Sequence, residues 1–90
     1  MKKSHVKLHG EVQGVGCRYF ISSAAREIGV VGFVKNLPDG CVEVFAEGED
    51  DAIDAFMETI KGGPPGGRVS KITLLEDIPL GEFARFTIEF

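Results

Sequence analysis

The sequence predicts an α+β fold whose strands and helices alternate in the order βαββαβ. Apolar residues recur at helical spacing in two segments, 18–29 and 49–61, and each segment runs to a glycine. The stretches between them are short, rich in β-branched and aromatic residues, and bounded by glycine, proline and aspartate. Two helices on one face of an antiparallel sheet form the split βαβ, or ferredoxin-like, arrangement.

The first strand is predicted where Val6 and Leu8 alternate with polar residues. It leads directly into a glycine-rich stretch at 10–18. The first helix follows and stops at Gly29, because glycine readily takes the left-handed conformation that ends a helix. The apolar stripe of this helix consists of Ile21, Ala24, Ala25 and Ile28.

The second helix has the clearer apolar stripe, and three acidic residues at 49–51 stand at its start, where the helix dipole favours negative charge. Its stripe, at i, i+3, i+4 and i+7, consists of Ile53, Phe56, Met57 and Ile60. Right-handed crossovers place the first strand and its glycine loop in the middle of the sheet. The remaining strands are predicted at 30–37, 41–47, 69–75 and 83–90, with a hairpin turn at Pro38-Asp39-Gly40. The last two strands are counted together as the final β of the βαββαβ order, the penultimate one folded into the last pair.

Length and charge narrow the range of functions. Ninety residues predict one domain, 1–90, with little room for a second core. A net charge of −4 argues against a nucleic acid or an anionic membrane as the partner of the whole surface. A site for an anion must therefore be local and built from a few groups.

The sequence also predicts a cytoplasmic protein. No apolar run approaches the ~18 residues that a membrane span needs, and the basic N-terminus lacks the apolar stretch of a signal peptide. In a reducing compartment Cys17 and Cys41 are expected to be free thiols. Their wide separation, with no Cys-x-x-Cys pair, gives no indication of a metal site.

The glycine-rich stretch 10–18 is the strongest candidate for a binding site. A glycine-rich turn between a strand and a helix directs several backbone N–H groups into one concavity. Arg18 at its exit adds a planar charged fork that matches phosphate oxygens. A tight turn followed by a solvated arginine explains the turn equally well. The position of Arg18 at the opening of a helix favours the anion site.

Two further residues are candidates for chemistry. Asn36 ends a predicted strand before the hairpin turn, where it caps the turn or holds a water molecule through its amide. Cys17 stands at a helix N-terminus, where thiol pKa values fall. Because Cys17 directly precedes Arg18, the two cannot converge on one phosphate for in-line attack, and a packing role is expected. The stretch also lacks the Gly-Lys-Ser/Thr ending of a nucleotide-binding P-loop.

Two motifs stand on either side of the first predicted helix. The first consists of Leu8, Gly10, Val12, Gln13, Gly14, Val15 and Arg18. The second consists of Gly32, Phe33, Val34, Lys35, Asn36, Gly40, Val42 and Gly48. Together they resemble the two signatures of the acylphosphatase family, and the resemblance extends over almost the whole chain. One departure is Cys17, which stands where the family usually has Phe or Met, and Tyr19 or Phe20 is expected to fill the space that a larger side chain would occupy.

The resemblance implies an enzyme that hydrolyses carboxyl-phosphate mixed anhydrides to carboxylate and orthophosphate. It implies Arg18 and Asn36 as catalytic residues, with Asn36 orienting the attacking water. It also implies no metal, no cofactor and no covalent enzyme intermediate. The expected partner is a small acyl phosphate, with no nucleic acid and no membrane, and the expected state is a monomer. The implied phosphate-binding loop consists of Gln13, Gly14, Val15, Gly16, Cys17 and Arg18.

Two other functions stay open on the sequence alone. A non-catalytic phosphate- or ligand-binding module could use the same fold and the same loop. An RNA-binding domain of this fold is disfavoured by the net charge and by the predicted strand 41–47, which lacks paired aromatic and basic residues.

Overall fold

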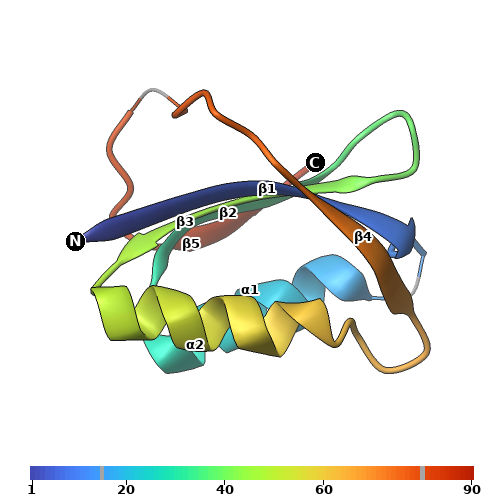
Figure 1. Cartoon of the computed structure of the whole chain (residues 1–90), viewed down its shortest axis with the longest axis horizontal. Helices are drawn as coiled ribbons and strands as arrows, with labels where there is room; N and C mark the ends of the chain where they lie inside the picture. The colour runs from blue at the N-terminus through green and yellow to red at the C-terminus, as the bar shows by residue number, and fades with distance from the viewer. Residues whose placement is uncertain (15, 80) are drawn as a thin grey trace.

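The computed structural model describes residues 1–14, 16–79 and 81–90, and it confirms the predicted order of elements. Both helices lie on one side of a single sheet (Figure 1). No described helix is long and apolar enough to cross a membrane. The elements are β1 (Lys2–Glu11), α1 (Cys17–Ile28), β2 (Val31–Asn36), β3 (Val42–Gly48), α2 (Asp50–Lys61), β4 (Arg68–Leu74) and β5 (Phe86–Glu89).

The sheet has the strand order β4-β1-β3-β2-β5, so β1 lies in its interior as the sequence predicts. Three of its four strand pairs are antiparallel, but β2 and β5 are parallel, which makes the sheet mixed rather than purely antiparallel. The reason is the path of the chain. It leaves β4 at the end of the sheet where β2 begins, crosses the face opposite the helices, and enters β5 in the direction of β2 (Figure 1).

The main core fills the space between the helices and the sheet. Both predicted stripes face it, with Ile21 and Ala25 from α1 buried alongside Ile53 and Phe56 from α2. Buried β-branched and other apolar residues of β1, β3 and β2 complete the layer. The end of β1 and the start of α1 are thereby fixed relative to each other.

A second, smaller cluster lies on the opposite face of the sheet, under the connection between β4 and β5. Phe83 from this connection packs against Phe33 and Phe45, at ring-centroid distances of 5.9 and 5.3 Å. The buried ring of His5 joins them, with Nε2 2.6 Å from Glu43 Oε2 and Nδ1 2.7 Å from the carbonyl oxygen of Asp77. These contacts hold the crossing segment on the sheet, so that β5 reaches the edge of β2.

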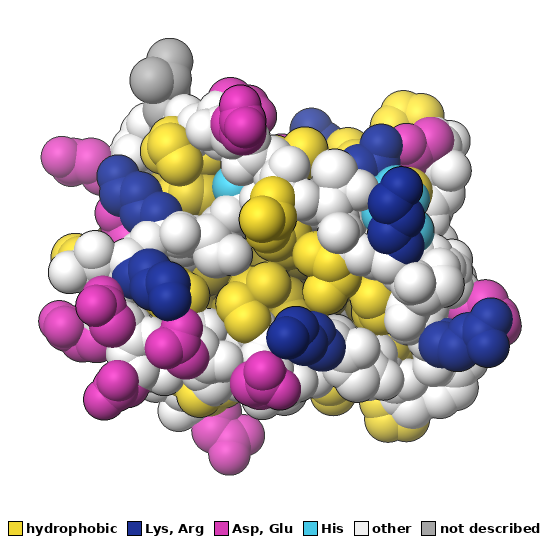
Figure 2. Space-filling model, viewed as in Figure 1, with side chains coloured by type: hydrophobic (Ala, Val, Ile, Leu, Met, Phe, Trp, Pro, Cys, Tyr) yellow, Lys and Arg dark blue, Asp and Glu magenta, His cyan; other side chains and the backbone are white. Residues whose placement is uncertain are grey.

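Charged side chains are distributed unevenly on the face seen in Figure 2. Acidic side chains gather over α2, whose first turn carries Asp50 and Asp51. The dipole of α2 is therefore matched by its own carboxylates, and this is not the case for α1.

Candidate active site

The glycine-rich loop brings the N-terminus of α1 to the end of β1. Gly14 and Gly16 have φ values of 76° and 74°, in the left-handed region that residues other than glycine rarely adopt. Gly16 is the N-cap of α1, and no side chain caps the first turn by a hydrogen bond. The free N–H groups of that turn are therefore available to an external acceptor.

Arg18 occupies an electrostatically unusual position in α1. The first turn of this helix contains no acidic residue, and a cation there lies at the positive end of the helix dipole. Such a placement costs free energy unless an anion binds between the guanidinium and the backbone N–H groups. The arrangement has the character of an anion site, in contrast to the acidic start of α2.

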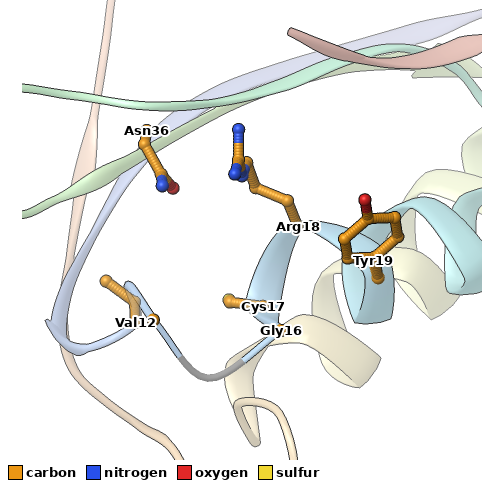
Figure 3. A pocket seen from close by; sticks show the side chains of 7 residues that line it. Val12, Gly16, Cys17, Arg18, Tyr19 and Asn36 are labelled. Atoms are coloured by element: carbon orange, nitrogen blue, oxygen red, sulfur yellow. The ribbon is translucent and has the colours of Figure 1, made fainter. Parts of the chain in front are cut away.

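A pocket opens at this point, and side chains from α1 and β2 reach into it (Figure 3). The guanidinium of Arg18 and the carboxamide of Asn36 extend toward the same space above the loop. The pocket is therefore assembled from segments far apart in the sequence. Its lining consists of Val12, Gly14, Gly16, Cys17, Arg18, Tyr19 and Asn36.

The carboxamide of Asn36 carries a buried oxygen atom. Its Oδ1 atom is buried and has no hydrogen-bond partner among the described residues. An unpaired buried carbonyl oxygen costs about 1–3 kcal/mol, so such atoms usually mark a place where a ligand or water binds. In this pocket, Oδ1 is an acceptor directed toward a space that also holds a cationic donor.

The last strand holds Arg18 in place. Arg18 Nη1 donates a hydrogen bond to the carbonyl oxygen of Glu89 at 3.2 Å, and its guanidinium carbon lies 4.7 Å from the ring centroid of Phe90. No other hydrogen bond of the guanidinium is made to the described residues, so its remaining N–H groups can face an anion. Sequence reasoning missed this contact, because no local pattern relates residue 18 to residues 89 and 90.

Only some of the predicted loop residues lie in the lining of the pocket. Gly14, Gly16, Cys17 and Arg18 line the pocket, whereas Gln13 does not. The side chain of Gln13 instead donates hydrogen bonds to the turn between β2 and β3. The predicted contribution of Val15 lies outside the described residues. Within the described ranges, no group of three or more His, Cys, Asp or Glu side chains is arranged to hold a metal ion.

Cys17 is buried at the start of α1, with only 3% of its surface exposed. Burial raises the pKa of its thiol to about 11, so the thiol is protonated at neutral pH. This agrees with a packing role and not with a nucleophile. Of the two aromatic residues expected to fill the space beside it, Phe20 packs against the core, whereas Tyr19 is exposed.

The raised pKa of Cys17 predicts a stability change at alkaline pH. The thiol ionises in the unfolded chain near its ordinary pKa of 9.0 but in the folded protein only near 11. The free energy of unfolding should therefore fall by about 2 kcal/mol more between pH 9 and 11 than in a Cys17→Val variant. Urea unfolding of both proteins across this range measures the difference. Parallel curves would show that the thiol does not titrate with folding.

Comparison with known proteins gives a consistent result. The acylphosphatase family model matches residues 4–88. The chain is 49% identical to an acylphosphatase of Acaryochloris marina over 81 residues, which cover 90% of this chain and 86% of that protein. It is 39% identical to an acylphosphatase of Thermotoga maritima over 90 residues, covering 100% and 99%.

A solved structure shows the same fold. The acylphosphatase of Bacillus subtilis superposes with a TM-score of 0.91 at 39% sequence identity, and the match covers 100% of both chains. The order of elements and the two sequence motifs thus both indicate the same family. The chain belongs to the acylphosphatase family, the enzymes that hydrolyse acyl phosphates.

Proposed function

We propose that this enzyme binds the phosphate of an acyl phosphate with Arg18 and the N–H groups of the glycine loop, and that Asn36 orients the attacking water. The observation that carries this assignment is the buried Oδ1 of Asn36, which has no partner among residues 1–14, 16–79 and 81–90, in the pocket that Arg18 enters. An acceptor at this place can take a hydrogen bond from a water molecule and direct the oxygen lone pair of that water at phosphorus.

The chemistry needs no further protein group. The water oxygen forms a bond to phosphorus, the bond from phosphorus to the carboxyl oxygen breaks, and the carboxylate leaves with the bonding electron pair. The proton that the water loses passes to the phosphate product or to solvent. A carboxylate is a weak base, so no general acid is required to protonate it. Positioning and electrostatic stabilisation can then supply the rate enhancement.

Stabilisation comes from groups that are already in place. Negative charge on the equatorial phosphate oxygens faces the guanidinium of Arg18 and the positive end of the α1 dipole. Because Glu89 and Phe90 restrain the guanidinium, little reorganisation is needed when substrate binds. The same groups explain why orthophosphate is expected to bind as a competitive inhibitor.

A turnover assay with benzoyl phosphate tests the activity. The purified protein should hydrolyse it at a rate that saturates with substrate and falls with added orthophosphate. A Cys17→Phe variant, which restores the usual residue of the family, should be active as well, because position 17 supplies a backbone N–H to the pocket. Phosphate binding without any turnover in either protein would instead indicate a non-catalytic binding module.

We further propose that residues 1–90 form one domain that acts in the cytoplasm as a monomer. The two cysteines are buried free thiols, which fits a reducing compartment. The family match spans residues 4–88 without interruption, which fits one folding unit. Light scattering during size-exclusion chromatography tests the state: a monomer has a mass of 9.7 kDa, and twice that value would contradict it.

A further inference from the structure

The side chain of Gln13 makes two hydrogen bonds that serve neither the core nor the pocket lining. Its Nε2 atom donates to the carbonyl oxygen of Leu37 at 2.8 Å and to that of Cys41 at 2.7 Å. Two carbonyl oxygens can be satisfied only by the NH₂ end of the carboxamide, because the other end would bring a third oxygen against them. The orientation of the amide is therefore fixed by its partners.

These two carbonyl groups lie at the base of the turn between β2 and β3. The turn is closed by a hydrogen bond from the backbone N–H of Leu37 to the carbonyl oxygen of Cys41 at 2.8 Å. Asn36 directly precedes Leu37, and Gly14 directly follows Gln13. Gln13 and its partner Leu37 are therefore each next in the chain to a residue that lines the pocket.

Regular strand pairing does not reach this point. The ladder between β1 and β3 ends at Leu8 and Val42, and beyond it β1 continues only along β4. Among the described residues of the loop 12–16, Gln13 alone makes side-chain hydrogen bonds to the turn. The other described side-chain contacts with the turn come from β1, from Lys7 to Asp39 and from His9 Nδ1 to Cys41 Sγ at 3.3 Å, and not from the loop.

We propose that Gln13 is a positioning residue that sets the distance between the phosphate-binding loop and the carboxamide of Asn36. The proposal rests on the function proposed above, in which the loop binds phosphate and Asn36 orients the water. Attack requires the water oxygen to be held about 3–3.5 Å from phosphorus and in line with the bond that breaks. A small displacement of the loop or of Asn36 therefore slows the reaction. Gln13 acts through its neighbours and does not touch the substrate.

Three substitutions separate the hydrogen bonds from the size of the side chain. Gln13→Glu keeps the shape but places a carboxylate oxygen against two carbonyl oxygens, so kcat should fall by about 10- to 100-fold. Gln13→Lys keeps a donor of sufficient length and should stay within about 5-fold of wild type. Gln13→Ala removes the link without repulsion and should lie between the two.

The inhibition constant of orthophosphate distinguishes positioning from binding. Arg18 and the helix N-terminus remain in each variant, so this constant should change by less than about 3-fold while kcat falls. The Gln13→Glu variant should also regain kcat relative to wild type as the pH is lowered toward 5, because a protonated carboxyl group can donate a hydrogen bond. The constants are compared for variants whose unfolding curves show them to be fully folded, because partial unfolding alone would lower kcat and leave the inhibition constant unchanged.

Asp39→Ala is the matched control in the same turn. Asp39 Oδ1 accepts a hydrogen bond from the backbone N–H of Cys41 at 3.0 Å, and its carboxylate pairs with Lys7. Neither of these partners belongs to the loop. This variant weakens the turn and leaves the Gln13 contact intact, so kcat should stay within about 3-fold of wild type. An equal loss of kcat in Asp39→Ala and Gln13→Ala would overturn the proposal.

Two other results would also overturn it: a folded Gln13→Glu variant with wild-type kcat, or a parallel loss of kcat and orthophosphate inhibition. If Gln13→Glu does not fold, the comparison of Gln13→Lys with Gln13→Ala decides, since only the former keeps the donor. A wild-type protein without turnover would contradict the proposed function itself. The two failures are therefore distinguishable.

Discussion

Replacing Arg18 with alanine should lower kcat/KM by about 10²–10⁴-fold, a loss of roughly 3–5 kcal/mol of transition-state stabilisation. The guanidinium is the cationic side chain of the pocket lining, and the dipole of α1 cannot replace its directed N–H groups. Ground-state binding of phosphate should weaken in the same variant. Steady-state kinetics with benzoyl phosphate, and inhibition by orthophosphate, measure both effects.

The Arg18→Lys variant is the control for charge alone. Lysine keeps the positive charge but loses the planar fork, so its activity should lie between those of wild type and Arg18→Ala. The fold should survive the alanine substitution, because removing a cation from a helix N-terminus offsets the lost contact with Phe90. Unchanged orthophosphate inhibition in folded Arg18→Ala would remove Arg18 from the binding site.

Replacing Asn36 with alanine should have a different signature. We expect kcat to fall by about 10²-fold or more, because the attacking water loses the acceptor that orients it. Orthophosphate inhibition should stay close to wild type, since Arg18 and the loop remain. The same kinetic measurements, made beside those on Arg18→Ala, separate water orientation from phosphate binding.

Stability gives an independent check on Asn36. Its Oδ1 is buried without a partner among the described residues, so truncation to alanine should not lower the free energy of unfolding by more than a few tenths of a kcal/mol. A turn-capping role would instead predict a loss of about 1 kcal/mol with kcat retained. Near-native turnover of Asn36→Ala would exclude Asn36 from the mechanism.

The sequence was sufficient to predict the parts of the site that depend on local chemistry. The left-handed conformations of Gly14 and Gly16 follow from glycine next to a helix start, and the stripes of α1 and α2 follow from helical periodicity. Asn36 was a weaker prediction, because an asparagine before a turn usually caps it. Its place at the end of a predicted strand made it a candidate, and the family resemblance then implied its catalytic role.

Contacts between distant segments could not be predicted in this way. The parallel pairing of β5 with β2 depends on the route of residues 75–85 across the sheet, and no periodicity encodes that route. The direction of the Gln13 side chain depends on where the turn after β2 comes to rest. Both features arise only after the tertiary fold has formed.

The contact between Arg18 and the end of β5 makes the activity of the enzyme depend on an edge strand of the sheet. β5 has four residues and pairs with a single neighbour, so it is among the segments expected to open first in local unfolding. When it detaches, the guanidinium loses the Glu89 carbonyl and the aromatic ring that restrain it. Catalytic rate should therefore decline with temperature ahead of global melting, in step with amide exchange of residues 86–89.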